Sequence, residues 1–233
     1  MFIFSKIDSR RHILGLIGAS IVALSACGGG GGTSNAVSGG GDYETEGDHA
    51  IGNPDAAVTV VEYASVVCGA CANWHNNVYP EFKAKYIDSG LVRFVFREFP
   101  TSPENLARAG FLIANCVPED RFFDNISLQF KRQTQIFAAA GNGTVRNEYI
   151  NIAKAGGLSE AEFEACLTNE DEIKRYEDVV KAGIDAGVSS TPTFFVNGEK
   201  GTGTNLFLLE DFDAALAPLL GDDSPPAETE AED

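Results

Sequence analysis

The chain has 233 residues, of which 44% are hydrophobic and 22% are charged, a composition typical of a globular domain with a core of its own. Lysine and arginine number 17 against 34 aspartate and glutamate residues, which gives a formal net charge of −17. Because proteins that bind nucleic acid rely on basic surfaces, this balance excludes nucleic acid as an expected partner and indicates a solvated acidic surface.

The first residues have the pattern of an export signal. Three basic side chains precede an apolar run over residues 13–26, which is too short to cross a bilayer comfortably and is typical of a signal peptide. The run ends in Leu-Ser-Ala-Cys, which resembles a bacterial lipobox. The resemblance implies that residues 1–26 are a lipoprotein signal peptide and that Cys27 is lipidated. The alternative is an ordinary secreted protein cleaved near Cys27.

Two polar segments flank the expected domain. Residues 27–50 are rich in glycine, serine and asparagine, which predicts a flexible tether. Residues 222–233 are acidic and contain adjacent prolines, which predicts a disordered tail and leaves residues 51–221 for the folded domain. Gly28 takes the place of the aspartate associated with inner-membrane retention in enteric bacteria. We therefore expect a periplasm-facing domain anchored to the outer membrane through the lipid on Cys27.

Residues 51–221 alternate between short β-branched runs and longer helical patterns, which predicts an α/β fold. One buried strand is expected over residues 58–63 and another over residues 91–96. Between them, apolar side chains at four-residue spacing predict a helix over residues 68–86. Pro80 is expected to kink this helix because its ring crowds the carbonyl four residues earlier.

A long helical block is expected to follow the second strand. It begins at Ser102, a predicted N-cap that precedes a proline, and continues to Gly156. Ser159, with a glutamate three residues later, predicts a capping box for a short helix. Asn169 is expected to open another helix that reaches Ala186.

The last elements return the chain to the sheet. Residues 193–196 are rich in β-branched and aromatic side chains and predict a strand, which the type I′ turn signal Asn197-Gly198 follows. An amphipathic helix over residues 209–220 closes the domain. The helices between the two parts of the sheet form an insertion expected at about residues 102–186.

Two cysteines stand one helical turn apart where the first long strand meets the first helix. Cys68-Gly69-Ala70-Cys71 is the pattern of a dithiol redox centre, because thiols three residues apart on a helix share a face and can form a disulfide. The first turn of a helix presents unpaired N–H groups and a positive dipole end, which favour a thiolate. We therefore expect Cys68 to be the nucleophile and Cys71 its partner.

Metal or haem binding is the alternative for this pair. A structural zinc site requires two further ligands at close spacing, but the other two cysteines of the domain are isolated. Covalent haem requires a histidine where this chain has Ala72. No metal or other cofactor is therefore expected. A copper carrier is kept as a second functional class, because Cys68, Cys71 and His75 could present two sulfurs and a nitrogen on one helix face.

The number of cysteines fits an oxidising compartment. Removing Cys27 from the five leaves four, an even number suited to two pairs. If Cys68 and Cys71 are the working pair, Cys116 and Cys166 remain. We expect a structural disulfide between them that closes a loop of about fifty residues, worth about 4 kcal/mol in the chain-entropy model. Two free buried thiols are the alternative.

Three motifs resemble the DsbA-like branch of the thioredoxin superfamily, across residues 51–221. The first is residues 62–71, Glu-Tyr-Ala-Ser-Val-Val-Cys-Gly-Ala-Cys, with an acidic residue six positions before the first cysteine. The second is residues 191–198, Thr-Pro-Thr-Phe-Phe-Val-Asn-Gly, which looks like the family's cis-proline loop. The third is the helical block, which plain thioredoxin lacks. The resemblance implies a thioredoxin-like fold with a helical insertion.

The resemblance also implies roles for three residues near the cysteines. Pro192 is expected to be cis, which places the backbone of Thr191 beside the Cys68 sulfur, where an extended substrate pairs with it. Glu62 is expected to lie buried behind Cys71 and to relay its proton. The alternatives are a trans proline that starts an edge strand and a surface carboxylate at a strand end.

The activity that the resemblance implies is disulfide formation in exported proteins through Cys68 and Cys71. The best-known DsbA proteins have Pro-His between the cysteines, whereas Gly69 and Ala70 carry no side-chain donor. Reduction or isomerisation of disulfides by the same residues is therefore an alternative, and an idle lipoprotein that only binds is another. The expected partners are exported proteins with thiols or disulfides, an unidentified redox partner and the membrane through the lipid. The chain is expected to be a monomer.

Overall fold

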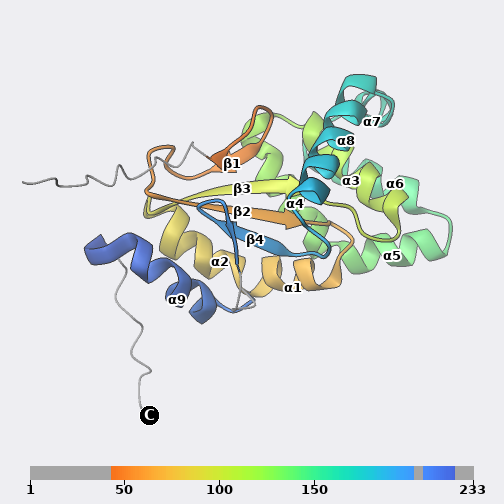
Figure 1. Ribbon diagram of the computed structural model, residues 1–233. Helices are drawn as coiled ribbons and strands as arrows, with labels where there is room; N and C mark the ends of the chain where they lie inside the picture. Colours follow the sequence, from red (N-terminus) through yellow and green to blue (C-terminus); the bar gives the residue numbers. More distant parts are fainter. Residues whose placement is uncertain (1–42, 202–206, 224–233) are drawn as a thin grey trace, which may run out of the picture. The chain divides into compact units, whose positions relative to one another are not determined.

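The computed structural model describes residues 43–201 and 207–223, which belong to one compact unit (Figure 1). The expected signal peptide, the lipidation site Cys27, the tether up to residue 42 and the acidic tail from residue 224 lie outside the described residues. Within the described part, no helix is long and apolar enough to cross a membrane.

A mixed sheet of five strands runs through the described part of the chain in the order β1-β3-β2-β4-β5. Its centre is the parallel pair β2 (Val58–Ala64) and β3 (Val92–Glu98). All seven residues of β2 are buried, as the run of valines predicts for a strand covered on both faces. The two long strands expected from the sequence are thus confirmed.

The second half of the sheet is antiparallel. β4 (Thr193–Val196) pairs with β2, and β5 (Glu199–Lys200) pairs with β4. Asn197 and Gly198 both have positive φ, at 47° and 77°, as a type I′ turn requires. The expected strand and hairpin are therefore confirmed.

The folded domain begins earlier than expected, because β1 (His49–Ile51) pairs antiparallel with the outer edge of β3. The segment before β1 is held by two arginines of β3. Arg93 donates hydrogen bonds to Glu44, and Arg97 donates to both Asp48 and the backbone of Tyr43. The expectation of a tether that reaches residue 50 is therefore wrong for residues 43–50.

The helix that follows β2 is broken at Val78, as Pro80 predicted. α1 (Gly69–Asn77) is followed by α2 (Tyr79–Phe82) and a π-helical turn, η2 (Lys83–Ile87). Proline has no N–H with which to bond the carbonyl of residue 76, so the hydrogen-bond ladder of α1 stops there. The first cysteine pair lies at the other end of α1, where the helix begins.

A block of helices from Glu104 to Asp185 forms the expected insertion. Its helices are α3 (Glu104–Cys116), η3 (Glu119–Arg121), α4 (Phe122–Lys131), α5 (Gln133–Gly141), α6 (Val145–Ala155), α7 (Glu160–Leu167) and α8 (Glu170–Asp185). α9 (Leu209–Leu220) and the turn η4 (Gly221–Asp223) follow β5. The α/β fold with a helical insertion is thus confirmed.

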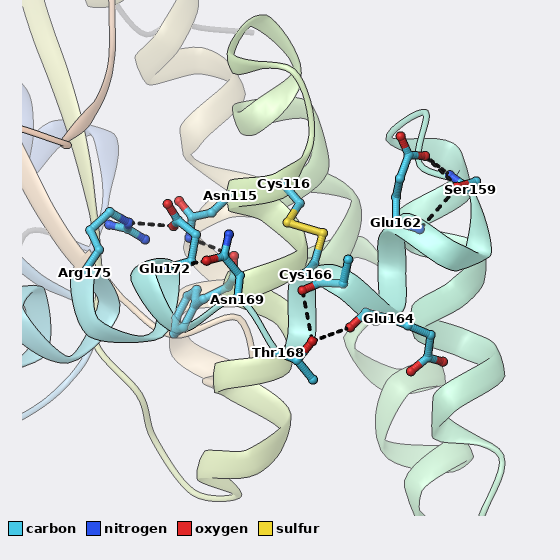
Figure 2. Close-up of a disulfide and its surroundings, with 12 residues drawn as sticks. Asn115, Cys116, Ser159, Glu162, Glu164, Cys166, Thr168, Asn169, Glu172 and Arg175 are labelled. Carbon is cyan, nitrogen blue, oxygen red and sulfur yellow. Dashed lines mark hydrogen bonds and ion pairs between the residues drawn. A yellow bond between two sulfur atoms is a disulfide. The ribbon is translucent and has the colours of Figure 1, made fainter.

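Of the three predicted N-cap residues, two are confirmed. Ser159 and Glu162 form the capping box of α7, and the side chain of Asn169 accepts hydrogen bonds from the first turn of α8 (Figure 2). Ser102 is not the N-cap of α3. The Ser102–Pro103 peptide is cis, and the carbonyl of Pro103 accepts the first hydrogen bonds of the helix, so the helix begins after the proline.

Trp74 fixes α1 to the sheet. This fully buried side chain packs against aromatic rings from α2, β3, β4 and α9, namely Tyr79, Phe82, Phe94, Phe194 and Phe212. α1, α2 and α9 lie along one face of the sheet, and α8 lies across the other (Figure 1). The start of α1 is therefore held at the end of β2 by packing on several sides.

Candidate active site

Cys68 is the N-cap of α1 and lies at the carboxyl end of the central strand β2. Its backbone is extended, with φ −83° and ψ 122°, and its sulfur accepts a hydrogen bond from the backbone N–H of Cys71 at 3.4 Å. A sulfur in this position faces the N–H groups that the first helical turn leaves unpaired. The Cys68 sulfur therefore lies at the N-terminus of α1, where the helix dipole makes the potential most positive.

The surroundings of Cys68 favour the thiolate form of its side chain. A hydrogen bond from the side chain of Cys71 is the main cause that lowers the pKa of the Cys68 thiol, from its ordinary 9.0 to about 6. Partial burial opposes this shift, while Thr191 and the backbone N–H groups of Ala70 and Cys71 support it. Cys68 is partly exposed, so its thiolate is accessible at neutral pH.

Cys71 has the opposite properties. Its side chain is fully buried, and burial raises the pKa of its thiol well above the usual range. The hydrogen bond to Cys68 and the charge of Glu62 raise the pKa further. Cys71 therefore keeps its proton when Cys68 has lost its own, and any reaction of Cys71 requires a group that moves this proton.

The loop before β4 lies against the Cys68 sulfur. The Thr191–Pro192 peptide is cis, and the carbonyl oxygen of Thr191 lies 3.3 Å from Sγ of Cys68, which donates to it in the thiol form. The hydroxyl of Thr191 is buried and lowers the pKa of Cys68. Apart from this sulfur it has no hydrogen-bond partner among the described residues. Segments 123 residues apart in sequence thus meet at one sulfur atom.

Glu62 lies on β2 and is fully buried beneath α1. Its Oε2 atom accepts a hydrogen bond from Nε2 of His75 at 2.8 Å. The sequence placed both residues near Cys71 but did not predict that they pair. Their partnership depends on the packing of α1 against β2, which no local pattern encodes.

Gln133 is a further residue of the site that the sequence did not reveal. From the first turn of α5, its side-chain amide donates hydrogen bonds of 3.0 Å to the backbone carbonyls of Val66 and Cys68. It therefore holds the loop between β2 and α1 from the helical insertion. A glutamine at a helix start carries no motif that could have indicated this contact.

Comparison with known proteins agrees with this geometry. A family model described as thioredoxin matches residues 44–216. The chain belongs to the thioredoxin family. A Rickettsia conorii protein named as a protein-disulfide oxidoreductase is 34% identical over 155 residues, which are 65% of this chain and 53% of that one. The chain spans between 53% and 64% of the length of its Rickettsia relatives.

Solved structures share the fold of this thioredoxin-family domain, including that of a DsbA protein. The crystal structure of Wolbachia pipientis α-DsbA1 has a TM-score of 0.69 at 24% identity and covers 77% of this chain and 94% of its own. A protein-disulfide isomerase from Novosphingobium aromaticivorans has a TM-score of 0.63 at 25% identity and covers 74% and 97%. The thioredoxin-like fold with a helical insertion is thus confirmed.

The other two cysteines of the thioredoxin-family domain are joined. A disulfide links Cys116 at the end of α3 to Cys166 in α7, with Cα atoms 6.0 Å apart and 50 residues between them in sequence (Figure 2). Cys68 and Cys71 are free thiols. The four described cysteines therefore divide into a bonded pair inside the insertion and a free pair at the start of α1.

The arrangement of His75 bears on the copper alternative. Its Nε2 atom is bonded to Glu62, and its ring stacks on Phe130 with centroids 4.1 Å apart. Within the described residues, no three histidine, cysteine, aspartate or glutamate side chains come together as a metal site. One of the two ring nitrogens of His75 is therefore bonded to a buried carboxylate.

Proposed function

We propose that this chain is a protein-disulfide oxidoreductase that forms disulfides in exported proteins. The observation that carries the proposal is the asymmetry of the cysteine pair: a partly exposed Cys68 with a pKa of about 6 beside a buried Cys71 with a strongly raised pKa. A thiol of low pKa leaves readily from a mixed disulfide, which favours transfer of the disulfide to the substrate.

The reaction starts from the Cys68–Cys71 disulfide. A substrate thiolate attacks Sγ of Cys68, the electron pair of the enzyme disulfide passes to Sγ of Cys71, and that sulfur takes up a proton. A second substrate thiolate then attacks the substrate sulfur of the mixed disulfide and releases Cys68 as a thiolate. The substrate leaves with a disulfide, and the enzyme is left with two reduced cysteines for a redox partner to reoxidise.

The remaining site residues support these steps. Glu62 lies beside Cys71 and is proposed to carry the proton that this buried sulfur gains and loses. The backbone of Thr191, with Pro192, is proposed to pair with an extended substrate strand, because its carbonyl already lies at the Cys68 sulfur. The disulfide between Cys116 and Cys166 is proposed to be structural.

The setting of the enzyme is proposed from its sequence. The lipobox at Cys27 supports a lipid-anchored domain in the cell envelope that faces the periplasm, with the outer membrane favoured over the inner. Exported proteins with thiols or disulfides are then its substrates. The domain is proposed to act as a monomer and to be reoxidised by a separate redox partner.

Reduction or isomerisation of disulfides is the second candidate function. It is favoured by Gly69 and Ala70, which lack side chains that could stabilise the Cys68 thiolate further. The two directions differ in the reduction potential of the cysteine pair. A potential below about −270 mV, the value of thioredoxin, would contradict the oxidase function.

Oxidative refolding of reduced ribonuclease tests the proposal. The oxidised domain should restore ribonuclease activity, whereas the variant Cys68→Ala should not. Reduction of insulin by the reduced domain, measured in parallel, tests the second candidate. A domain that does neither, although its cysteines are intact, would contradict both enzymatic functions.

A further inference from the structure

Cys71 and His75 stand one helical turn apart on α1, and both lie over the same side chain of β2. Oε2 of Glu62 accepts the hydrogen bond from Nε2 of His75, while Oε1 is buried with no hydrogen-bond partner among the described residues. The charge of Glu62 also reaches Cys71 and contributes to its raised pKa. His75 therefore holds one oxygen of the carboxyl group, while the other is unbonded in a residue whose charge reaches Cys71.

The pair is sealed from solvent, since the side chains of His75 and Glu62 are only 2% and 0% exposed. Aromatic rings from four elements enclose the imidazole, namely Trp74, Tyr79, Phe96 and Phe130. Its second nitrogen, Nδ1, has no hydrogen-bond partner among the described residues. Glu62 is therefore the hydrogen-bond partner that the surrounding structure provides for His75.

Two further titratable groups face the pair. Cys71 approaches from α1, and Tyr79 approaches from α2, with its ring centroid 5.0 Å from that of His75. The charges of Asp88 and Asp124 act on Tyr79 along with that of Glu62 and help burial to raise its pKa. The elements β3 and α4 contribute phenylalanine rings to this contact, Phe96 and Phe130, which carry no charge.

A buried pair of this kind is stable when it is neutral overall, because an isolated charge without solvent is costly. A carboxylate beside an imidazolium is neutral, and so is a carboxyl group beside an imidazole. The two forms differ only in the position of one proton along the hydrogen bond between Glu62 and His75. In either form the pair holds one proton next to Cys71.

We propose that Glu62 and His75 share one proton and that the pair, rather than Glu62 alone, protonates and deprotonates Cys71. The inference rests on the proposed function and specifies how its proton step occurs. When a thiolate attacks Cys68 and the disulfide breaks, the electron pair goes to Sγ of Cys71, and the carboxyl group of Glu62 passes the shared proton to that sulfur. A proton from solvent restores the pair, and oxidation of the cysteines reverses the transfer.

His75 is a positioning residue in this scheme, because it acts on Cys71 only through Glu62. Single-turnover reduction of the oxidised domain by dithiothreitol tests its role, with the fluorescence of Trp74, the only tryptophan of the chain, as the signal. The rate is measured from pH 5 to 9 and expressed per dithiothreitol thiolate. Three variants are compared with the unmodified domain: H75F, H75Q and E62Q.

Each variant removes a different part of the pair. Phenylalanine keeps the ring that stacks on Phe130 but has no nitrogen, and glutamine can still donate to Glu62 but carries no exchangeable charge. At pH 7, E62Q should slow the reaction about 100-fold, the range of general acid catalysis. H75F and H75Q both remove the group that shares its proton with Glu62. Each should therefore slow the reaction about tenfold and make its rate depend less on pH.

A double variant distinguishes shared action from packing. If His75 acts through Glu62, H75Q combined with E62Q should be no slower than E62Q alone, whereas effects of packing would add. H49F is the matched control, because His49 is bonded to Asn115 and stacks on Phe122 rather than contacting Glu62. Its pH profile should equal that of the unmodified domain.

An unchanged rate and pH profile in either H75F or H75Q would overturn the proposal, and so would additive slowing in the double variant. If H75F fails to fold, H75Q carries the test. Dithiothreitol reduces any accessible disulfide, so this assay does not depend on activity towards proteins. If the domain fails to refold ribonuclease but shows the expected His75 effects, the proposed function is contradicted and the shared proton is still supported.

Discussion

Cys68 and Cys71 differ in protonation although only two residues separate them. Cys68 is at the helix N-terminus, where its sulfur accepts hydrogen bonds and touches the loop at Thr191. Cys71 is one turn further on, inside the core and beside the charge of Glu62. The chain thus separates a reactive thiolate from a protonated thiol by a single helical turn, without a polar residue between them.

The lowered pKa of Cys68 predicts how the stability of the reduced domain changes with pH. A group whose pKa is lower in the folded state stabilises that state above its unfolded pKa, and the stabilisation is lost as the pH falls through the folded pKa. The reduced domain should therefore gain stability over the variant Cys68→Ser between pH 6 and pH 9. Thermal denaturation of both proteins at pH 6, 7.5 and 9 measures the difference, and a constant difference would contradict the lowered pKa.

Elements that follow from a local pattern were predictable, whereas the pairing of β1 with the distant strand β3 was not. The valine-rich run of β2, the capping box of α7 and the break at Pro80 each follow from a local pattern. β1 has three residues and follows a glycine-rich segment, so neither its length nor its composition indicates a strand. Its formation depends on the free edge of β3.

The same distinction applies to the site. The spacing of Cys68 and Cys71 predicts their shared helix face, and the resemblance to DsbA-like proteins implied the place of Thr191. The contact of Gln133 with the loop before α1 depends on how the insertion packs onto the sheet. Sequence reasoning therefore found the residues that react and missed those that hold them.

Loss of the Gln133 amide should loosen the start of α1. In Gln133→Ala, the carbonyl of Val66 loses its donor, which should lower the free energy of unfolding by about 1 kcal/mol. The thiolate of Cys68 should also react with iodoacetamide at a changed rate, because the backbone that positions it is less fixed. Urea denaturation and alkylation kinetics measure the two effects.

Gln135→Ala is the matched control for this prediction. Gln135 lies in the same turn of α5 but is exposed, so its removal should leave both stability and alkylation unchanged. Equal behaviour of the two variants would show that the contact of Gln133 with the loop has no effect on the site.

At the scale of the whole domain, two features tie distant parts of the chain together. The disulfide between Cys116 and Cys166 closes a long loop within the insertion. The segment from residue 43 to β1 closes the edge of the sheet through Arg93 and Arg97. Neither feature contacts the reacting sulfur atoms, so both are expected to affect stability more than chemistry.

Removal of the disulfide should separate stability from activity. The double variant C116A/C166A should lose about 3–4 kcal/mol of unfolding free energy, because the unfolded chain is no longer restricted by the closed loop. Its reduction by dithiothreitol should keep the rate of the unmodified domain. Urea denaturation and the fluorescence assay of Trp74 measure both, and a matched fall in rate would assign the disulfide a role in the reaction.

The start of the folded domain can be tested by shortening the chain. A protein that begins at residue 43 keeps β1 and both arginine contacts, whereas one that begins at residue 52 leaves the edge of β3 unpaired. Arg97 then loses Asp48, its partner in a largely buried ion pair, and breaking such a pair costs at least about 2 kcal/mol. The shorter protein should unfold at lower urea concentration, and its edge strand should promote association. Equal stability of the two proteins would show that residues 43–51 do not contribute to the stability of the fold. Because the Cys68 sulfur is held by β2, α1 and the loop at Thr191, the longer protein should react with dithiothreitol as the full chain does.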